Sequence, residues 1–481
     1  MPDWEYEPFA AFLTDDHFEV TDAGQLHAPV RSFSLKRNDK LQIILETKCG
    51  EKAEINEILR PAGSIRTNLD AVELRSRFSP TTARLIGVQR LETHTTSSRA
   101  RSELKDTSKV QRVKAELSRA QPATQTIDWL ENARNDFYLW PDMVKDQTVT
   151  TKTRAFGRTA EALRLTSNDE RSSSGRRALN LNVGGVELYL VAGTREDTRG
   201  YIFYVGTPDD DTRRKIRTVL SFTLGIYLVH LGHSTYAADS ELASFEAISA
   251  YSIDGRAFDL HTLPPAPIGK RGDNDLDPVC ASRIINAIYS AYDDLNFGAL
   301  SWAYWHAMCA PIHIAAVHFG AAIEALQRRY AEKHLKDFET KLISRKSDWD
   351  AFAGPMTTHI DKLDITTDRK DLLKANIGLL NQMPRRIVTD TVFDHLNIAF
   401  GEEERRAWRQ RNDAAHGNEM PPGSWTDTIR DTRILRVLFH RMVLRMTNAT
   451  DRYADYASVG FPVRPLAEPT PGAGNPNATE S

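Results

Sequence analysis

An arginine and a histidine near the C-terminal end of the chain have the side-chain chemistry needed to cleave RNA without a metal. They are Arg411 and His416, in the segment A-W-R-Q-R-N-D-A-A-H-G-N-E from Ala407 to Glu419. A guanidinium is always charged, and its planar donors suit a phosphate. An imidazole gains or loses a proton near neutral pH. The imidazole would move protons at the 2′-hydroxyl or the leaving 5′-oxygen, and the guanidinium would stabilise charge on the phosphorane.

The spacing of this pair does not suit a single regular helix. Side chains five positions apart on an ideal helix point about 140° apart. A turn or a partner subunit must therefore bring Arg411 and His416 to one phosphate. An alternative is that Asn412 is a helix N-cap, that Gly417 ends a short helical piece, and that the arginine and the histidine are ordinary surface residues.

The motif R-N-D-A-A-H-G resembles the R-x(4–6)-H signature of HEPN domains, in which Asn, Asp or His typically follows the arginine. Asn412 fits this preference. Arg409 also has a permitted spacing, but Gln410 follows it, so the family arginine is assigned to Arg411. The resemblance implies an all-helical domain and a metal-independent endoribonuclease that leaves 2′,3′-cyclic phosphate and 5′-hydroxyl ends, with Arg411, Asn412 and His416 in its catalytic site.

A carboxylate on an earlier helix is a further candidate. Similar HEPN domains carry an acidic residue on a core helix that hydrogen-bonds the motif arginine or histidine, and the segment A-A-I-E-A-L places Glu324 there. The resemblance implies that Glu324 holds Arg411, or orients His416 and tunes its pKa. The alternative is a surface carboxylate that pairs with Arg328, four residues along the same helix.

The composition predicts a globular protein, and no cofactor is expected. The chain has 481 residues, of which 41% are hydrophobic, and its formal net charge is -3 at pH 7. Any RNA contact must therefore come from a local basic patch. Cys49, Cys280 and Cys309 indicate neither disulfides nor a zinc site, and instead favour a reducing compartment. The sequence has no phosphate-binding glycine loop and no nucleophile elbow.

Neither a targeting segment nor a membrane span is expected. The segment from Met1 to Ala11 is acidic and aromatic, unlike a signal peptide. The longest apolar run, Val219 to Leu231, is too short to cross a membrane and contains polar residues. We therefore expect a cytoplasmic protein.

Residues 1–270 are expected to form a β-rich domain. Gly184-Gly185 predicts a tight hairpin turn, and helical spacing runs from Arg213 to Leu231. The mixed charges from His94 to Ala120 predict a solvated helix or connector, or alternatively a nucleic-acid contact without aromatic residues for stacking. Alternating or β-branched apolar residues predict strands at His17–Val20, Val30–Leu35, Leu41–Thr47, Arg84–Gln89, Ala178–Val183, Val186–Val191, Tyr201–Val205 and Glu241–Ser252.

Residues 275–455 are expected to form a helical bundle. The segment from Asp254 to Pro278 is rich in Asp, Pro and Gly and marks the boundary. The predicted helices are Val279–Asp293, Leu300–Tyr330 with a bend at Pro311, Asp371–Met383, Asp390–Ala399, Glu402–Gln410 and Thr426–Thr447. The second of them carries an apolar stripe with helical spacing, formed by Ile312, Ala316, Phe319, Ile323, Leu326 and Tyr330.

Three other features carry separate predictions. His306, His313 and His318 lack the i, i+4 spacing of zinc-binding pairs and are expected to be core or surface histidines. Residues 456–481 are rich in Pro, Gly and Asn and are expected to form a disordered tail. The arginines of the last helix are expected on its surface, either solvated or in contact with RNA phosphates; they are Arg430, Arg433, Arg436, Arg441 and Arg445.

The expected fold class is α+β, with a β-rich N-terminal domain followed by an all-α HEPN helical bundle. The segment from Arg217 to Tyr236 is similar to the end of the domain that precedes HEPN in ApeA-like proteins. That resemblance implies a toxic nuclease of anti-phage abortive infection. It further implies a phage-derived trigger and places tRNA among the candidate targets, whereas the HEPN resemblance itself implies RNA as the substrate and a homodimer formed through the helical domain.

Two alternatives to this function stay open. The helical domain could be a catalytically silent HEPN module that binds RNA, a nucleotide or a partner protein. The N-terminal domain could instead do the recognising while the helical domain mainly dimerises the protein.

Overall fold

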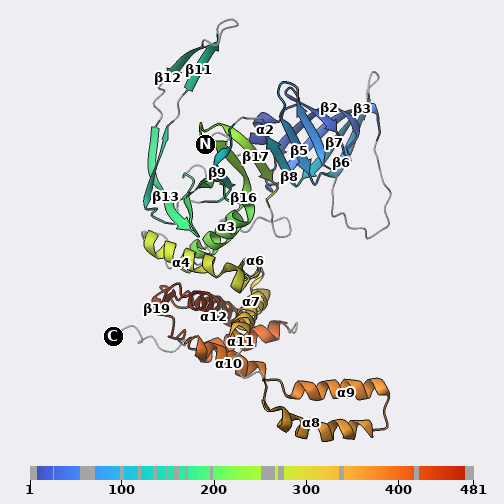
Figure 1. The fold of residues 1–481 in the computed structure, drawn as a ribbon, viewed down its shortest axis with the longest axis vertical. Helices are drawn as coiled ribbons and strands as arrows, with labels where there is room; N and C mark the ends of the chain where they lie inside the picture. Colours follow the sequence, from blue (N-terminus) through green and yellow to red (C-terminus); the bar gives the residue numbers. More distant parts are fainter. Residues whose placement is uncertain are drawn as a thin grey trace. The chain divides into compact units, whose positions relative to one another are not determined.

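The computed structural model of this α+β chain divides into two compact units (Figure 1). The first comprises residues 1–264 and 270–286, and the second comprises residues 265–269 and 287–481. The residues that the structure describes are 8–24, 26–54, 71–97, 102–117, 121–133, 138–147, 150–155, 162–167, 172–194, 199–250, 266–268, 276–334, 341–415 and 422–471.

An antiparallel sheet of 11 strands organises the first unit. Across the sheet the strands are β1 (Phe18–Asp22), β4 (Val72–Ser76), β5 (Thr82–Ile86), β8 (Arg112–Glu116), β17 (Leu242–Ile248), β16 (His230–Ala237), β9 (Ala123–Leu130), β15 (Gly200–Val205), β14 (Val186–Val191), β13 (Ser172–Val183) and β10 (Asp142–Gln147). The predicted hairpin at Gly184-Gly185 is confirmed, because Val183 pairs with Val186. Both glycines have positive φ, 59° and 87°, as a tight two-residue hairpin turn requires.

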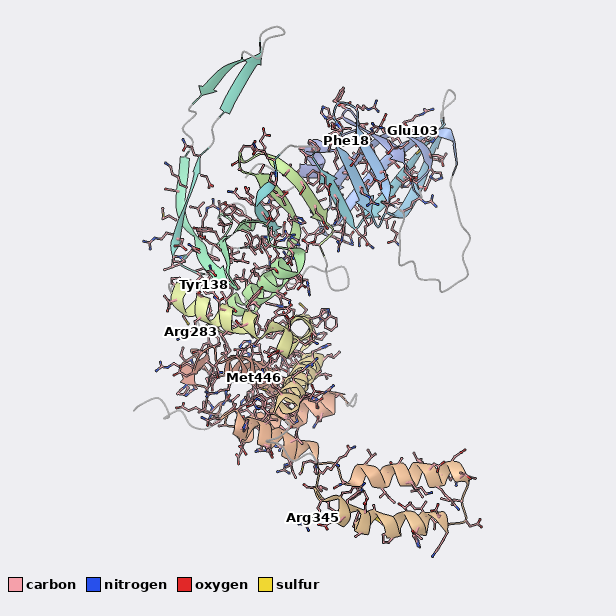
Figure 2. The ribbon with its side chains drawn as sticks, viewed as in Figure 1. Phe18, Glu103, Tyr138, Arg283, Arg345 and Met446 are labelled. Atoms are coloured by element: carbon pink, nitrogen blue, oxygen red, sulfur yellow. The ribbon has the colours of Figure 1, made fainter. Side chains whose placement is uncertain are left out.

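A second antiparallel sheet packs against one half of the first. Its strands are β2 (Ala28–Arg37), β3 (Ile43–Glu54), β7 (Ser102–Val110) and β6 (Gln89–Ser97). A single apolar core takes Phe33 and Leu45 from this sheet and Leu74 and Leu85 from the large one. Phe18, labelled in Figure 2, lies in the same core. The short helix α2 (Pro8–Phe12) adds to it, and β11 (Thr150–Ala155) and β12 (Ala162–Ser167) form a separate hairpin.

The prediction of a solvated helix or connector from His94 to Ala120 is wrong for the described residues, which form the end of β6 and all of β7 and β8. Two of its lysines pair with carboxylates on neighbouring strands: Lys105 with Glu46 at 3.0 Å and Lys114 with Glu246 at 2.8 Å. Between the charges, Val110, Val113 and Ala115 point into the core. Apolar and charged residues alternate along these strands, which is the pattern of a half-buried strand. The large number of charged residues led to the wrong prediction.

The helix α3 (Asp210–Leu224) covers the other half of the large sheet. Asp209 caps its N-terminus by accepting a hydrogen bond from the Thr212 backbone at 2.7 Å, and Gly225 ends it with a φ of 59°. The predicted helix from Arg213 to Leu231 is therefore right in its first part only. After Gly225 the chain leaves the helix, and His230 and Leu231 are the first residues of β16.

The second unit is a helical bundle around α7. Its helices are α5 (Tyr292–Leu295), α6 (Phe297–Cys309), α7 (Ile312–Lys333), α8 (Lys346–Asp361), α9 (Thr367–Leu380), α10 (Arg385–His395), α11 (Glu402–Ala415) and α12 (Trp425–Met446). The division between the units falls within α4 (Pro278–Ser290). The predicted apolar stripe on α7 is buried at Ala316, Phe319, Ile323 and Leu326.

The predicted long helix with a bend at Pro311 is instead two helices, α6 and α7, which are separated at this proline. In the described part of the chain, no helix is long and apolar enough to cross a membrane.

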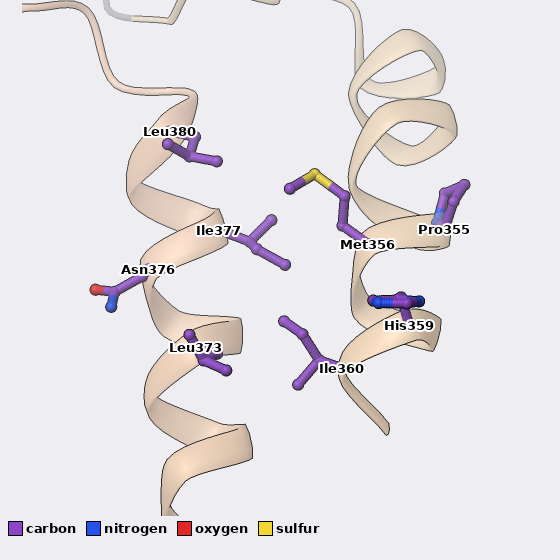
Figure 3. Close-up of a pocket in the computed structure, with 8 residues that line it drawn as sticks. All are labelled: Pro355, Met356, His359, Ile360, Leu373, Asn376, Ile377 and Leu380. Carbon is purple, nitrogen blue, oxygen red and sulfur yellow. The ribbon is translucent and has the colours of Figure 1, made fainter. Parts of the chain in front are cut away.

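The helices α8 and α9 form a hairpin, and α8 was not predicted. Figure 3 shows the apolar pocket between them, of about 500 Å³, with Ile360 and Ile377 pointing into it. The base of the hairpin is closed by Asn381. Its side chain accepts a hydrogen bond from the Ile343 backbone at 2.7 Å and donates one to the Ile343 carbonyl at 3.1 Å. The backbone of Lys341 pairs with that of Gln382 at the same place.

Two predictions at the C-terminal end are wrong. Arg441 is fully buried in α12 rather than exposed, and it pairs with the buried Glu404 at 3.0 Å. Residues 456–471 of the expected tail are ordered, and residues 472–481 lie outside the described residues. β19 (Val463–Pro465) pairs with β18 (Arg452–Ala454), and the Leu466 carbonyl accepts a hydrogen bond from Arg441 at 2.9 Å. The buried guanidinium needs acceptors, and this segment supplies one of them.

The core of the helical unit should lose stability in acid because of His440. This side chain is 1% exposed, and burial beside Arg436 lowers its pKa to about 3. Between a pH of about 6.5, the pKa of an unfolded histidine, and the folded value, only the unfolded state binds the extra proton. The free energy of unfolding should therefore fall, by at most about 1.4 kcal/mol per pH unit.

The measurement is urea unfolding followed by helical circular dichroism, from pH 7 to pH 4. His440→Gln should flatten the loss of stability on acidification, whereas His359→Gln, which changes an exposed histidine, should leave it unchanged. Equal slopes for His440→Gln and wild type would contradict this prediction.

Candidate functional site

Arg411 and Asn412 lie on the last turns of α11, which continues five residues beyond the predicted end at Gln410. Three glutamates, Glu402 to Glu404, occupy its first turn and suit the positive end of the helix dipole. Since Asn412 is inside the helix, the alternative in which it caps a helix N-terminus is wrong. α11 ends at Ala415, one residue before His416.

Glu324, on α7, contacts the motif arginine directly. Its Oε1 lies 2.5 Å from Nη2 of Arg411, and the two side chains are 26% and 13% exposed. The pair joins two helices that are far apart in the sequence, which a pair with Arg328 on α7 would not do. The contact that the resemblance implied is present, and its catalytic role stays a prediction.

Three further residues fix the position of the Arg411 guanidinium. Its Nη1 donates to Oδ1 of Asn412 at 2.5 Å, and its central carbon lies 4.7 Å from the ring centre of Trp408. The backbone of α7 comes so close at Gly320 that a Cβ there would lie 2.2 Å from Nε of Arg411. Arg411 is therefore clamped between a carboxylate, an indole ring and a glycine.

Sequence reasoning missed Gly320 and Trp408, although both had a readable signal. Gly320 is four residues before Glu324, and Trp408 is three residues before Arg411. Gly320 therefore lies on the same face of α7 as Glu324, and Trp408 on the same face of α11 as Arg411.

A pocket of about 640 Å³ opens beside this cluster, between α7, α10 and α11. Glu324, Trp408, Arg411 and Asn412 all contribute to its wall. His416 lies outside the described residues, so the site described is the arginine half of the predicted pair.

The predicted histidines of α6 and α7 are only partly described. His306 and His318 have ring centres 6.3 Å apart, and the ring of His306 is bonded to the Trp302 carbonyl at 2.8 Å. Partial burial and the nearby His306 lower the pKa of His318. The side chain of His313 is outside the described part of the structure.

A second polar cluster, which was not predicted, lies in the first unit between the large sheet and α3. Asp128, His230 and His233 place their ligand atoms within 4.8 Å of one another, close enough to share a metal ion. Asp128 is also paired with Arg213 at 2.6 Å and with Arg217. These two guanidinium groups supply the positive charge that a metal would bring, so the ion pairs account for the buried carboxylate.

The electrostatics of this cluster follow from the same contacts. Burial alone would raise the pKa of Asp128, but Arg217, His230 and Arg213 hold it well below its usual range. Burial and Arg217 lower the pKa of His230, and burial and Arg213 lower that of His233 to about 4. The cluster is best described as a charged contact that holds α3 on the sheet.

No family model, curated protein or solved structure matches this chain.

The Glu324–Arg411 pair should stabilise the helical unit. Glu324→Gln keeps the shape of the side chain but removes its charge, leaving a mostly buried guanidinium without a counter-ion. We expect the free energy of unfolding to fall by about 1–3 kcal/mol. Chemical denaturation of wild type, Glu324→Gln, Arg411→Met and the double variant measures the coupling between the two side chains.

The matched control is Glu332→Gln on the same helix. Glu332 lies 3.8 Å from Arg329, and both side chains are about half exposed, so the change should be within about 0.5 kcal/mol. A similar loss in both glutamine variants would mean that the contact with Arg411 is not what stabilises the unit.

Gly320 should resist even the smallest substitution. An alanine in place of an ordinary helical glycine stabilises a helix by up to about 1 kcal/mol. At Gly320 the added Cβ would displace Arg411, so Gly320→Ala should destabilise the protein. Gly378→Ala, at a helical position with no atom within 4 Å of the added Cβ, should stabilise it. A gain of stability for both variants in urea unfolding would refute the close packing of Gly320 on Arg411.

Proposed function

We propose that this chain is a metal-independent endoribonuclease whose site contains Arg411, Asn412, His416 and Glu324. The observation that supports this most directly is the clamped Arg411, which Glu324 holds at 2.5 Å in the wall of a pocket. An ordinary surface arginine is neither fixed on three sides nor mostly buried. A phosphate-binding arginine gains from being fixed, because the site then needs little rearrangement as charge develops on the phosphate.

The contacts of Arg411 leave donors for a phosphate. A guanidinium has five N–H groups. One is given to Glu324 and one to Asn412, and the Nε–H is buried without a partner among the described residues. Among the described residues, nothing takes the remaining N–H on each terminal nitrogen, and this pair can bind the oxygens of a phosphorane in the planar, two-pronged manner of arginine.

His416 would supply the proton transfers. The 2′-oxygen of the RNA attacks phosphorus and gives its proton to the imidazole, while the bond from phosphorus to the 5′-oxygen breaks and that oxygen takes up a proton. The products are a 2′,3′-cyclic phosphate and a 5′-hydroxyl. Since one imidazole cannot be base and acid at the same instant, a homodimer with a second copy of the motif suits this chemistry.

The setting of the activity is proposed from the sequence resemblance. On that basis, the protein is a cytoplasmic HEPN enzyme that acts in abortive infection. Its substrate is RNA, with tRNA among the candidates, and a phage-derived trigger activates it. The silent alternative uses the same pocket to bind RNA, a nucleotide or a protein without cleaving anything.

The test is cleavage of total cellular RNA by the purified protein in EDTA, with analysis of the product ends. Wild type should produce cyclic phosphates. Arg411→Ala and His416→Ala should each reduce cleavage by about 10²–10³-fold, as expected for loss of a charge-stabilising donor or a general acid–base group.

The matched controls are Arg345→Ala and His359→Ala, which remove an exposed arginine and an exposed histidine and should cleave like wild type. If all five proteins cleave equally, the site is elsewhere. If wild type does not cleave RNA either alone or in extract from phage-infected cells, the result favours the alternative in which the helical domain binds a ligand without cleaving it.

A further inference from the structure

The pocket beside Arg411 has an excess of positive charge. Five arginines and three carboxylates line it. Within it, Arg411 is paired with Glu324 at 2.5 Å and Arg405 with Asp390 at 2.6 Å. The third carboxylate is paired with an arginine that is not part of the pocket wall.

The other three arginines of the pocket are Arg328, Arg386 and Arg409. All three are exposed, and within the described ranges no carboxylate pairs with any of them. A row of arginines on one helix face is usually a solvated surface. These three come instead from three helices, α7, α10 and α11, and meet at one pocket. Such convergence concentrates positive potential and favours a ligand with several negative charges.

The pocket also provides flat surfaces that suit a nucleobase. The guanidinium of Arg411 lies over the Trp408 ring at 4.7 Å, and that of Arg405 lies over the Phe400 ring at 4.9 Å. Unpaired bases in RNA stack on aromatic rings and on guanidinium planes. A base that enters the pocket can therefore extend one of these two stacks.

One buried donor in the pocket wall lacks an acceptor. Gln327 is 7% exposed, and its Oε1 accepts a hydrogen bond from the Thr389 hydroxyl at 3.3 Å. Its Nε2 has no hydrogen-bond partner among the described residues. An unsatisfied buried donor costs about 1–3 kcal/mol. A ring nitrogen or carbonyl oxygen of a base could satisfy it.

We propose, building on the ribonuclease function above, that this pocket holds one unpaired nucleotide of a single-stranded RNA beside the bond to be cut. Arg328, Arg386 and Arg409 contact the neighbouring phosphates, and Gln327 contacts the base. The volume of about 640 Å³ is in the usual range for ligand pockets. A base inside a duplex cannot enter, so the substrate class is single-stranded or looped RNA.

The test is binding of a short, labelled 2′-O-methyl RNA to the full-length protein in EDTA, measured by fluorescence anisotropy over a series of salt concentrations. The methylated 2′-oxygen cannot attack phosphorus, so binding is read without cleavage. Wild type should bind the single strand at least about tenfold more tightly than the matching duplex. Arg328→Gln, Arg386→Gln and Arg409→Gln should each reduce the salt slope by about 0.7.

Two further variants separate the roles. Gln327→Leu should keep the salt slope of wild type but reduce the differences in affinity among oligonucleotides that vary in base. Arg369→Gln, an exposed arginine of α9 outside the pocket, should behave like wild type.

Three results would overturn the inference: equal affinity for duplex and single strand, salt slopes unchanged in all three arginine variants, or a mononucleotide that competes as well as the RNA strand. Failure of the ribonuclease proposal looks different. In that case RNA is never cleaved in the EDTA assay, whereas the binding pattern of the pocket variants still holds. If instead wild type cleaves and the pocket variants bind normally, only the pocket inference fails.

Discussion

The helical unit depends on the buried ion pair between Arg441 and Glu404. Both side chains are 0% exposed, and a buried ion costs several kcal/mol unless every polar atom finds a partner. The guanidinium meets this demand with the carbonyls of Ala399 and Leu466, and the carboxylate meets it with the backbone of Thr470 at 2.8 Å. The arrangement of α11, α12 and the C-terminal segment gives partners to the charged groups of both side chains. We infer that the pair fixes how these elements pack, because breaking it would leave an uncompensated buried charge.

That geometry reaches the candidate site through α11. Glu404 and Arg411 are seven residues apart, so they differ by only about 20° around the helix and lie on one stripe with the buried Ala407. A buried helix face normally carries apolar residues, yet here both ends of the stripe are charged. Glu404 fixes the rotation of α11 against α12, and this same rotation turns Arg411 towards Glu324 on α7.

The sequence was most informative where apolar spacing or turn chemistry was strong, and least informative where charges determine the packing. The stripe on α7 and the Gly184-Gly185 hairpin could be read directly. The strands between His94 and Ala120 could not, because Lys105 and Lys114 are paired across the sheet. The helix Lys346–Asp361 was hidden by its internal proline. In the site, the contact between Glu324 and Arg411 was foreseen from the motif. The contacts of Gly320 and Trp408 with Arg411 were not foreseen, because helical spacing alone does not show that the backbone of α7 comes close to this guanidinium.

The hairpin of α8 and α9 begins and ends at one place. Lys341 and Gln382 pair through their backbones, and Asn381 bonds to both the N–H and the C=O of Ile343. A segment of some forty residues thus begins and ends on neighbouring stretches of backbone. Its length therefore has little effect on the position of the chain before and after it. The entropic cost of closing such a loop also grows only slowly with its length. This is the geometry of a modular insertion. The bundle that carries Arg411 could keep its connectivity with a longer, a shorter or an entirely different element in this position.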